Sequence, residues 1–270
     1  MRSPGMKTNK TIIGLLASIL FAGPIFSADK VVFVHGRSGS HCGTGTTDVN
    51  NYWGDSKNIS TGEQRYFVGY DGATDPRNWG NCRAQSSLWT VLYNQCRGAN
   101  NCKIVCHSAG CYATDYFLSK YGFVTDSYDV NISYVLAAAS ASGGSELADL
   151  AFWESNSMVA ALKTGTARSF NHNVSGGVAS YHVAGFDGDW YASWRLAGED
   201  DGAVAFHTTC GKNTTGSYDD CKYDGTQWTS HYVWNDASEA GYSSGKQAID
   251  TDHGGVKTSV RNMYNRLFGY

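Results

Sequence analysis

The chain has 270 residues, of which 41% are hydrophobic and 13% aromatic, and its formal net charge at pH 7 is −3. Such a composition supports a sizeable buried core, and no repeat or low-complexity linker indicates a second domain. The small net charge and the lack of long charged runs exclude a basic footprint for nucleic acid.

The N-terminal segment has the pattern of an export signal. Lysines precede an apolar run over residues 12–21, and the small residues Ser27 and Ala28 follow it. This order predicts a secretory signal peptide at residues 1–28, and a single domain of roughly 240 residues at 29–270. The predicted location is extracellular or periplasmic. An uncleaved membrane anchor is the alternative, although the apolar run is short for a span.

The rest of the chain alternates between strand-like and helix-like segments. Apolar and β-branched runs predict strands, at residues 30–34, 65–70, 102–106, 131–138 and 178–185. Apolar residues at helical spacing predict helices, at residues 84–95, 109–121, 144–150 and 256–268, with Gly122 as the C-cap of the second. This alternation predicts an α/β fold with a mostly parallel sheet covered by helices on both faces. Functional residues are then expected at the carboxyl ends of the strands.

Residues 104–110, with the sequence IVCHSAG, run from a predicted strand into a predicted helix. In a nucleophile elbow, a serine on such a sharp turn exposes its hydroxyl, and small residues must flank it. Gly110 satisfies this requirement, whereas Cys106 stands where the first glycine is usual. We therefore predict Ser108 as a nucleophile. The alternative is an ordinary serine that caps the helix.

A serine hydroxyl becomes a nucleophile when a base removes its proton and an acid orients that base. In one recurrent chain order, the acid follows the serine and the base comes last. His253, in the flexible sequence DHGG before the final helix, is the predicted base, and Asp201, in the turn sequence EDDGAV, is the predicted acid. The alternatives for the acid are Asp187, Asp189 and Asp200.

The tetrahedral intermediate of such a reaction needs two backbone N–H donors for its oxyanion. We assign these donors to Ala109, directly after the serine, and to Arg37, in the loop that follows the first strand. His35 and His107 are expected to support the loops that contain them. The predicted site therefore consists of Ser108, Asp201, His253, Arg37 and Ala109, with no metal and no organic cofactor.

Eight cysteines follow the export signal, and an oxidising compartment favours disulfides. Spacing predicts the pairs Cys96–Cys102, Cys210–Cys221 and Cys42–Cys82. Cys106 and Cys111 either pair and brace the elbow or stay as buried thiols. A zinc site is not expected, because the spacings lack a paired C-x-x-C set.

These motifs together resemble the α/β-hydrolase family, and within it the secreted bacterial lipases and esterases. His35-Gly36 is similar to the family's HG oxyanion motif, residues 106–110 to its lipase box, and residues 144–149 to a segment after the next strand. Residues 201–204, with a cysteine after them, resemble the D-G-L-V acid motif, and Asp252-His253 resembles the base loop. The resemblance implies an α/β-hydrolase fold and ester hydrolysis through an acyl-enzyme on Ser108.

The resemblance also sets expectations about partners. Many such lipases bind calcium through an aspartate two residues after the base, and Gly255 stands there, so no calcium site of that kind is expected. Residues 151–178 match the lid segment, and Phe152, Trp153, Met158 and Leu162 either form its apolar face or complete the core. The expected substrate is an acylglycerol, a short-chain ester or a polyester, with a lipid–water interface as a possible partner. An acyltransferase with the same triad and a non-catalytic extracellular binding protein are the alternatives.

Overall fold

The structure, a computed structural model, describes residues 29–59, 62–170, 172, 178–188, 195–196, 198, 200–209, 231–233 and 249–268. The predicted export signal and the predicted Cys210–Cys221 bridge lie outside the described residues. Over the ranges that the structure describes, no helix is both long enough and apolar enough to span a membrane.

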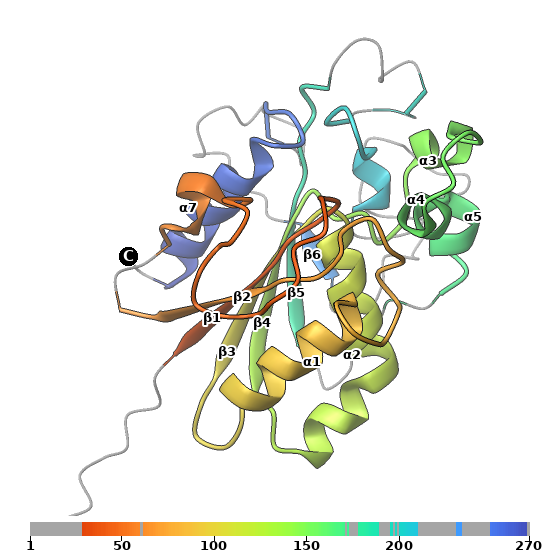
Figure 1. The fold of residues 1–270 in the computed structure, drawn as a ribbon. Coiled ribbons are helices and arrows are strands. Elements are labelled where there is room, and N and C mark those ends of the chain that lie inside the picture. The colour runs from red at the N-terminus through yellow and green to blue at the C-terminus, as the bar shows by residue number, and fades with distance from the viewer. Residues whose placement is uncertain are drawn as a thin grey trace, which may run out of the picture.

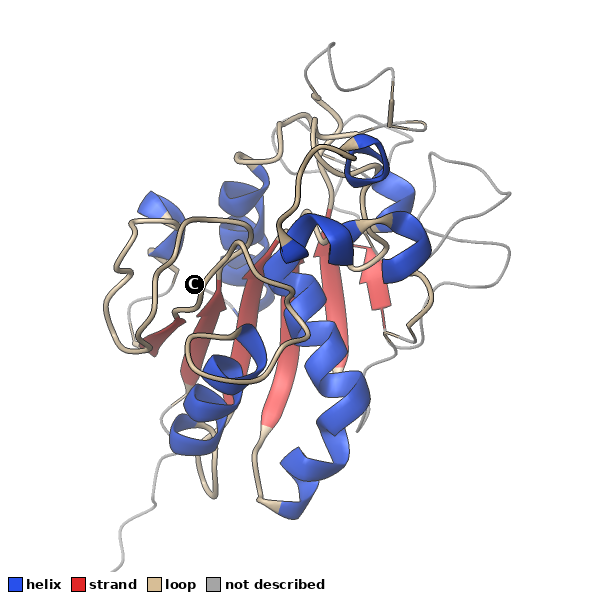
Figure 2. Ribbon diagram, turned by 45° about the vertical axis from the view of Figure 1, so that its right-hand side comes forward, coloured by secondary structure: helices blue, strands red, loops and turns tan. Residues whose placement is uncertain are grey.

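A single sheet of six parallel strands forms the centre of the protein, in the order β2-β1-β3-β4-β5-β6. The strands are β1 (Lys30–Val34), β2 (Gln64–Val68), β3 (Cys102–His107), β4 (Ile132–Ala138), β5 (Ala179–Val183) and β6 (His231–Val233). Figure 2 shows their arrows pointing the same way between the helical layers. The first five match the predicted strands closely. The sequence analysis missed β6, because three residues are too few for a recognisable apolar pattern.

Each face of the sheet has its own core, as alternate residues of β1 show. Val32 and Val34 belong to the cluster that also contains residues of α1 (Ala84–Gln95) and α2 (Ala109–Ser127). Val31 and Phe33 instead belong to the cluster that contains apolar residues of α7 (Val256–Phe268). All five residues of β1 are buried, as expected of a parallel strand covered on both sides. The predicted helices on both faces are thus confirmed (Figure 1).

The remaining helical elements are short and lie outside the sheet layers. They are η1 (Gly54–Lys57), α3 (Glu146–Leu150), α4 (Ser157–Leu162), α5 (Thr164–Ala167) and η3 (Phe206–Thr208). In Figure 1, α3, α4 and α5 form one group beside the carboxyl ends of β4 and β5. This group forms part of the wall of the cavity described below.

The predicted end of α2 at Gly122 is wrong, because the helix continues to Ser127. Gly122 is buried inside the helix, where a glycine costs only about 1 kcal/mol relative to alanine and can be tolerated. The chain turns instead at Asp129, which has a positive φ of 55°, and the N–H of Val130 donates to the carbonyl of Thr125. Asp129, rather than the glycine, adopts the left-handed conformation that ends this helix.

The apolar residues expected at residues 151–178 divide into two groups. Met158 and Leu162, on α4, are buried in the core, whereas Phe152 and Trp153 are 86% and 70% exposed. Met158 and Leu162 therefore complete the core, as one of the two interpretations of this segment predicted, whereas Phe152 and Trp153 do not. The exposed pair forms an aromatic tip on the loop between α3 and α4.

Three disulfides lie within the described residues. They are Cys42–Cys82, Cys96–Cys102 and Cys106–Cys111. The first two are pairs that the spacing predicted. The third decides between the two alternatives for Cys106 and Cys111, which form a bridge in the structure, with both residues fully buried.

Candidate active site

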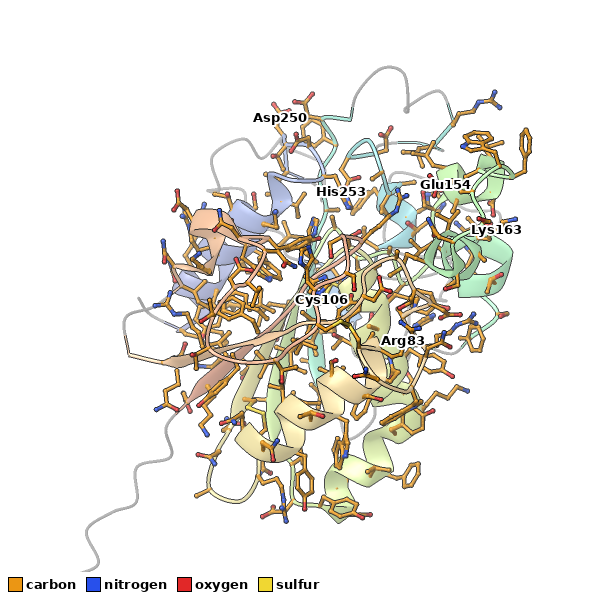
Figure 3. The ribbon with its side chains drawn as sticks, in the orientation of Figure 1. Arg83, Cys106, Glu154, Lys163, Asp250 and His253 are labelled. Carbon is orange, nitrogen blue, oxygen red and sulfur yellow. A yellow bond between two sulfur atoms is a disulfide. The ribbon has the colours of Figure 1, made fainter. Side chains whose placement is uncertain are left out.

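The carboxyl ends of β1 and β3 bring the first predicted residues together. Ser108 follows β3 directly, and the loop that contains Arg37 follows β1, which pairs with β3 in parallel register. In Figure 3, the labelled Cys106 marks the end of β3, and His253 and Glu154 lie beyond the strand ends. The predicted site residues therefore lie at the carboxyl ends of the strands, where an open parallel sheet is expected to place its site.

Ser108 occupies the turn between β3 and α2 in a conformation that L-residues rarely adopt, with φ 55° and ψ −130°. Its carbonyl accepts from the N–H groups of Cys111 and Ala141, and its own N–H donates to the carbonyl of Ala138. A positive φ in a non-glycine residue costs about 1–3 kcal/mol and persists only when its surroundings impose it. These three bonds, with the Cys106–Cys111 bridge across the turn, are the constraints that hold it.

The glycine of the elbow is required by close approach of β1. A Cβ on Gly110 would lie 2.3 Å from the carbonyl oxygen of His35 and 2.4 Å from that of Val34, both backbone atoms. No side chain can be accommodated at such distances. Cys106, in contrast, is tolerated where a glycine is usual, because its side chain turns to the first turn of α2 and bonds to Cys111.

A buried carboxylate, Asp201, and a partly exposed imidazole, His253, form an acid–base pair. His253 Nδ1 lies 2.9 Å from Asp201 Oδ2, and Asp201 Oδ1 accepts from the backbone N–H groups of Ala203 and Val204 at 3.0 and 2.8 Å. A carboxylate oxygen accepts hydrogen bonds, so Nδ1 is the donor and carries the imidazole proton. His253 Nε2 is then left with a free lone pair, which is the state a general base needs.

The structure also distinguishes between the candidate acids. Asp201 is only 2% exposed and contacts the imidazole, whereas the Asp187 side chain is exposed. Asp200 is buried, but its Oδ1 accepts from the backbone N–H of Gly202. Asp189 lies outside the described residues.

Ser108 and His253 line the same cavity, which has a volume of about 340 Å³. Most of its wall is apolar and comes from α3, α4 and the loop after Asp201, through Leu147, Ala148, Ala151, Val159, Leu162 and Val204. In the described part of the chain, Ser108 Oγ makes no hydrogen bond to the imidazole. Such catalytic hydrogen bonds are often long without a substrate and tighten when one binds.

Of the two predicted oxyanion donors, Arg37 lines this cavity and Ala109 directly follows Ser108, which also lines it. Ala109 opens α2, and N–H groups in the first turn of a helix have no acceptor within the helix. The backbone N–H of Arg37 donates to no group within the residues that the structure describes. The Arg37 side chain forms an ion pair with Glu154, which also lines the cavity. The distance from Arg37 Nη2 to Glu154 Oε2 is 2.9 Å.

The sequence analysis assigned His107 a supporting role but did not identify its partners. Its ring nitrogens contact Tyr52 Oη at 2.5 Å and the carbonyl oxygen of His253 at 2.7 Å. Burial lowers the pKa of His107 well below its usual range. Tyr52 lies in no recognisable sequence motif, so nothing in the sequence could have identified it as a partner of His107.

A buried polar group lies behind the cavity wall. Ser142 Oγ donates to Asp115 Oδ2 at 2.6 Å and lies 2.9 Å from Ser140 Oγ, while Asp115 Oδ1 has no hydrogen-bond partner among the described residues. Burial raises the pKa of Asp115 to about 7, although the hydrogen bond from Ser142 opposes the shift. Ala141, between the two serines, lines the cavity and bonds to Ser108.

We expect Asp115→Asn to stabilise the protein at alkaline pH. In the unfolded chain the carboxyl ionises near pH 4, but in the folded protein it stays protonated up to about 7, so wild-type stability falls as pH rises between these values. The amide stays neutral throughout. Unfolding measurements should therefore show the variant gaining about 4 kcal/mol over wild type at about pH 8 and only about 1 kcal/mol at about pH 4.5. An equal difference at both pH values would contradict this, and the exposed Asp126→Asn is the matched control on the same helix.

No protein-family model matches the chain, and no curated protein matches it in sequence. Solved structures do match it over most of its length. The mature Bacillus licheniformis lipase BlEst2 gives a TM-score of 0.58 at 17% identity, covering 92% of this chain and 94% of that one. The chain has the α/β-hydrolase fold.

Two further structures of similar size support this assignment. Staphylococcus hyicus lipase gives a TM-score of 0.52 at 10% identity, covering 92% of this chain and 96% of that one. EstA from Clostridium botulinum gives 0.51 at 11% identity, covering 88% and 86%. The predicted fold class is thus confirmed, and the proposed Ser108, Asp201 and His253 follow the chain order expected for this fold.

Among the described residues, no three His, Cys, Asp or Glu side chains lie close enough together to hold a metal ion.

Proposed function

We propose that this protein is a secreted serine carboxylic-ester hydrolase that acts through an acyl-enzyme on Ser108. The observation that carries the proposal is the bond between Asp201 and His253, whose imidazole lines one cavity with a serine on a strained strand-to-helix turn. Two of the structural neighbours are named lipases, which agrees with an ester substrate. The predicted export signal and the buried disulfides are the support for secretion.

In the proposed reaction, Ser108 Oγ attacks the ester carbonyl carbon while His253 Nε2 takes the hydroxyl proton. The carbonyl oxygen becomes an oxyanion, and the backbone N–H groups of Arg37 and Ala109 stabilise it by donating one hydrogen bond each. Collapse of the intermediate breaks the bond to the alcohol, which leaves with the proton from His253. Water then attacks the acyl-enzyme by the same steps, releasing the acid and restoring Ser108.

The proposal is tested by labelling and by assay of the disulfide-intact protein. A fluorophosphonate should modify Ser108 and no other residue, as read by peptide mass spectrometry, and p-nitrophenyl esters of short and medium chains should be hydrolysed. Alcoholysis measured against hydrolysis of one acyl donor separates a hydrolase from an acyltransferase. A folded protein that neither labels nor hydrolyses any of these esters would instead support a binding protein.

We further propose that the aromatic tip, Phe152 and Trp153, contacts a lipid–water interface. It precedes Glu154, which lines the cavity, so an anchored tip would bring the cavity mouth to the lipid. Burying an aromatic side chain removes about 150–250 Å² from water, at roughly 25 cal/mol per Å², so even partial insertion adds substantial affinity.

We expect the double change Phe152→Ser and Trp153→Ser to lower hydrolysis of an emulsified ester by roughly ten-fold, given this loss of buried apolar area. Hydrolysis of a dissolved short-chain ester should not change. Phe123→Ser is the matched control, because Phe123 is 66% exposed but lies near the far end of α2. Equal losses on both substrates, or an equal loss in the control, would rule out an interfacial role for the tip.

A further inference from the structure

Tyr52 and His107 form a hydrogen-bonded chain that ends on the backbone of His253. The phenol oxygen of Tyr52 lies 2.5 Å from His107 Nδ1, and His107 Nε2 lies 2.7 Å from the His253 carbonyl oxygen. A carbonyl oxygen can only accept, so Nε2 carries the imidazole proton and Nδ1 accepts from the phenol. Both ring nitrogens of His107 are therefore used, and its tautomer is determined by its partners.

The base loop depends on such an external contact. Gly254 and Gly255 directly follow His253, and glycine leaves the backbone with more conformational freedom than any other residue. The N–H of His253 donates to the Asp201 carbonyl at 2.8 Å, and its own carbonyl accepts from His107. The main chain is thus held on both sides of the His253 Cα, once by the acid loop and once by the elbow.

The contact from the elbow couples the base to the nucleophile. His107 directly precedes Ser108 in the chain, and its ring centroid lies 4.7 Å from that of the His253 ring. A shift of the base loop relative to the elbow must therefore break the hydrogen bond to His107 or displace its buried ring. This contact therefore helps to set the distance between the Ser108 hydroxyl and the His253 imidazole, together with the bonds from Asp201.

Tyr52 is itself firmly held. The Asp48 carboxylate accepts from the backbone N–H groups of Tyr52 and Trp53 at 3.1 and 2.9 Å. Lys257, in the first turn of α7, donates to the Tyr52 carbonyl at 2.7 Å, and its ammonium lies 4.6 Å from the ring centroid. The phenol is thus a fixed donor to His107.

We infer that Tyr52 and His107 are positioning residues, which hold the His253 imidazole at the place from which it deprotonates Ser108. The inference rests on the proposed ester hydrolysis. Neither residue transfers a proton to the substrate in this role. A misplacement of about 1 Å in such a constellation can lower a rate by about 10²-fold.

The test compares two substitutions of His107 that differ in hydrogen bonding. Gln can donate its amide N–H to the His253 carbonyl, whereas Leu fills similar space without a donor. We expect His107→Gln to keep kcat for a soluble p-nitrophenyl ester within about five-fold of wild type, and His107→Leu to lose about 10²-fold with little change in KM. If the ring only fills space, Leu should retain at least as much kcat as Gln, which would overturn the inference.

Tyr52→Phe tests the other end of the chain while keeping the ring. We expect kcat and the rate of fluorophosphonate modification to fall together by about 10-fold or more, and Tyr52→Phe added to His107→Leu to cause almost no further loss, as expected for residues of one network. The matched control is Tyr264→Phe, which removes a buried phenol on α7 that bonds to Glu63. It should lower the unfolding temperature but not kcat.

The outcomes separate the two proposals. Wild-type protein that does not label or hydrolyse esters contradicts the proposed function itself. Active wild type together with full kcat in Tyr52→Phe contradicts only the positioning role. If His107→Leu does not fold, His107→Gln and Tyr52→Phe still test the positioning role. Gln keeps a polar side chain at residue 107, and Phe keeps the aromatic ring at residue 52.

Discussion

Replacing Ser108 by alanine is expected to lower kcat/KM for a soluble p-nitrophenyl ester by at least about 10⁴-fold, since loss of a triad nucleophile leaves only binding and oxyanion stabilisation. The fold should survive, because the backbone of Ser108, not its hydroxyl, makes the bonds to Ala138, Ala141 and Cys111. Steady-state hydrolysis, with thermal unfolding as a check of stability, measures both effects. Fluorophosphonate labelling should vanish in the same variant.

Arg37→Ala is the appropriate control for this experiment. The oxyanion donor assigned to Arg37 is its backbone N–H, which the substitution retains. The substitution also removes the partly exposed ion pair with Glu154, and such pairs contribute only about 0–1 kcal/mol. We expect kcat/KM to fall by less than about ten-fold. Substantial activity in Ser108→Ala would show that another group is the nucleophile.

Asp201→Asn is expected to lower kcat by about 10³–10⁴-fold, because it reverses the tautomer of the base. The amide oxygen can still accept from the N–H groups of Ala203 and Val204, which leaves the amide NH₂ facing His253 Nδ1. Nδ1 must then accept, so the proton moves to Nε2, and the imidazole can no longer take a proton from Ser108. The geometry is almost unchanged, so the loss should appear in kcat rather than in KM.

Two neighbouring carboxylates provide controls for Asp201. Asp187, the rival acid, has an exposed side chain, and Asp252 adjoins the base but accepts from the backbone N–H of Gly255. Asp187→Asn and Asp252→Asn should each keep kcat within a few-fold of wild type. A loss in Asp187→Asn as large as that in Asp201→Asn would transfer the acid's role to the other loop.

Local patterns were sufficient for most of the fold. The β-branched run of β1 and the short apolar runs of β3 and β4 predict strands, because burial on both faces of a parallel sheet requires such residues throughout. The end of α2 was mispredicted because a helix ends where the chain must turn, and Gly122 lies inside the packed part of the helix. A glycine permits a turn but does not require one.

The candidate site also combines residues that the sequence identifies with contacts that only the tertiary structure shows. Ser108, its flanking Gly110 and the loop histidine His253 are recognisable from the sequence, because the elbow and the order of its partners are features of the chain itself. The sequence also favoured Asp201 as the acid, but Asp187 lies in a similar Asp-Gly sequence, and only the packing of the loops brings the Asp201 carboxylate to His253.

The sequence by itself determined the strand–turn–helix with its serine, the parallel α/β architecture and two of the disulfides within the described residues, because each depends on residues near one another or on the period of burial. Only the tertiary structure decided the bridge between Cys106 and Cys111, the exposure of Phe152 and Trp153, and the contact of Tyr52 with His107. The contact of Tyr52 with His107 depends on how segments far apart in the chain pack over the strand ends, and none of the three features leaves a periodic signal in the sequence.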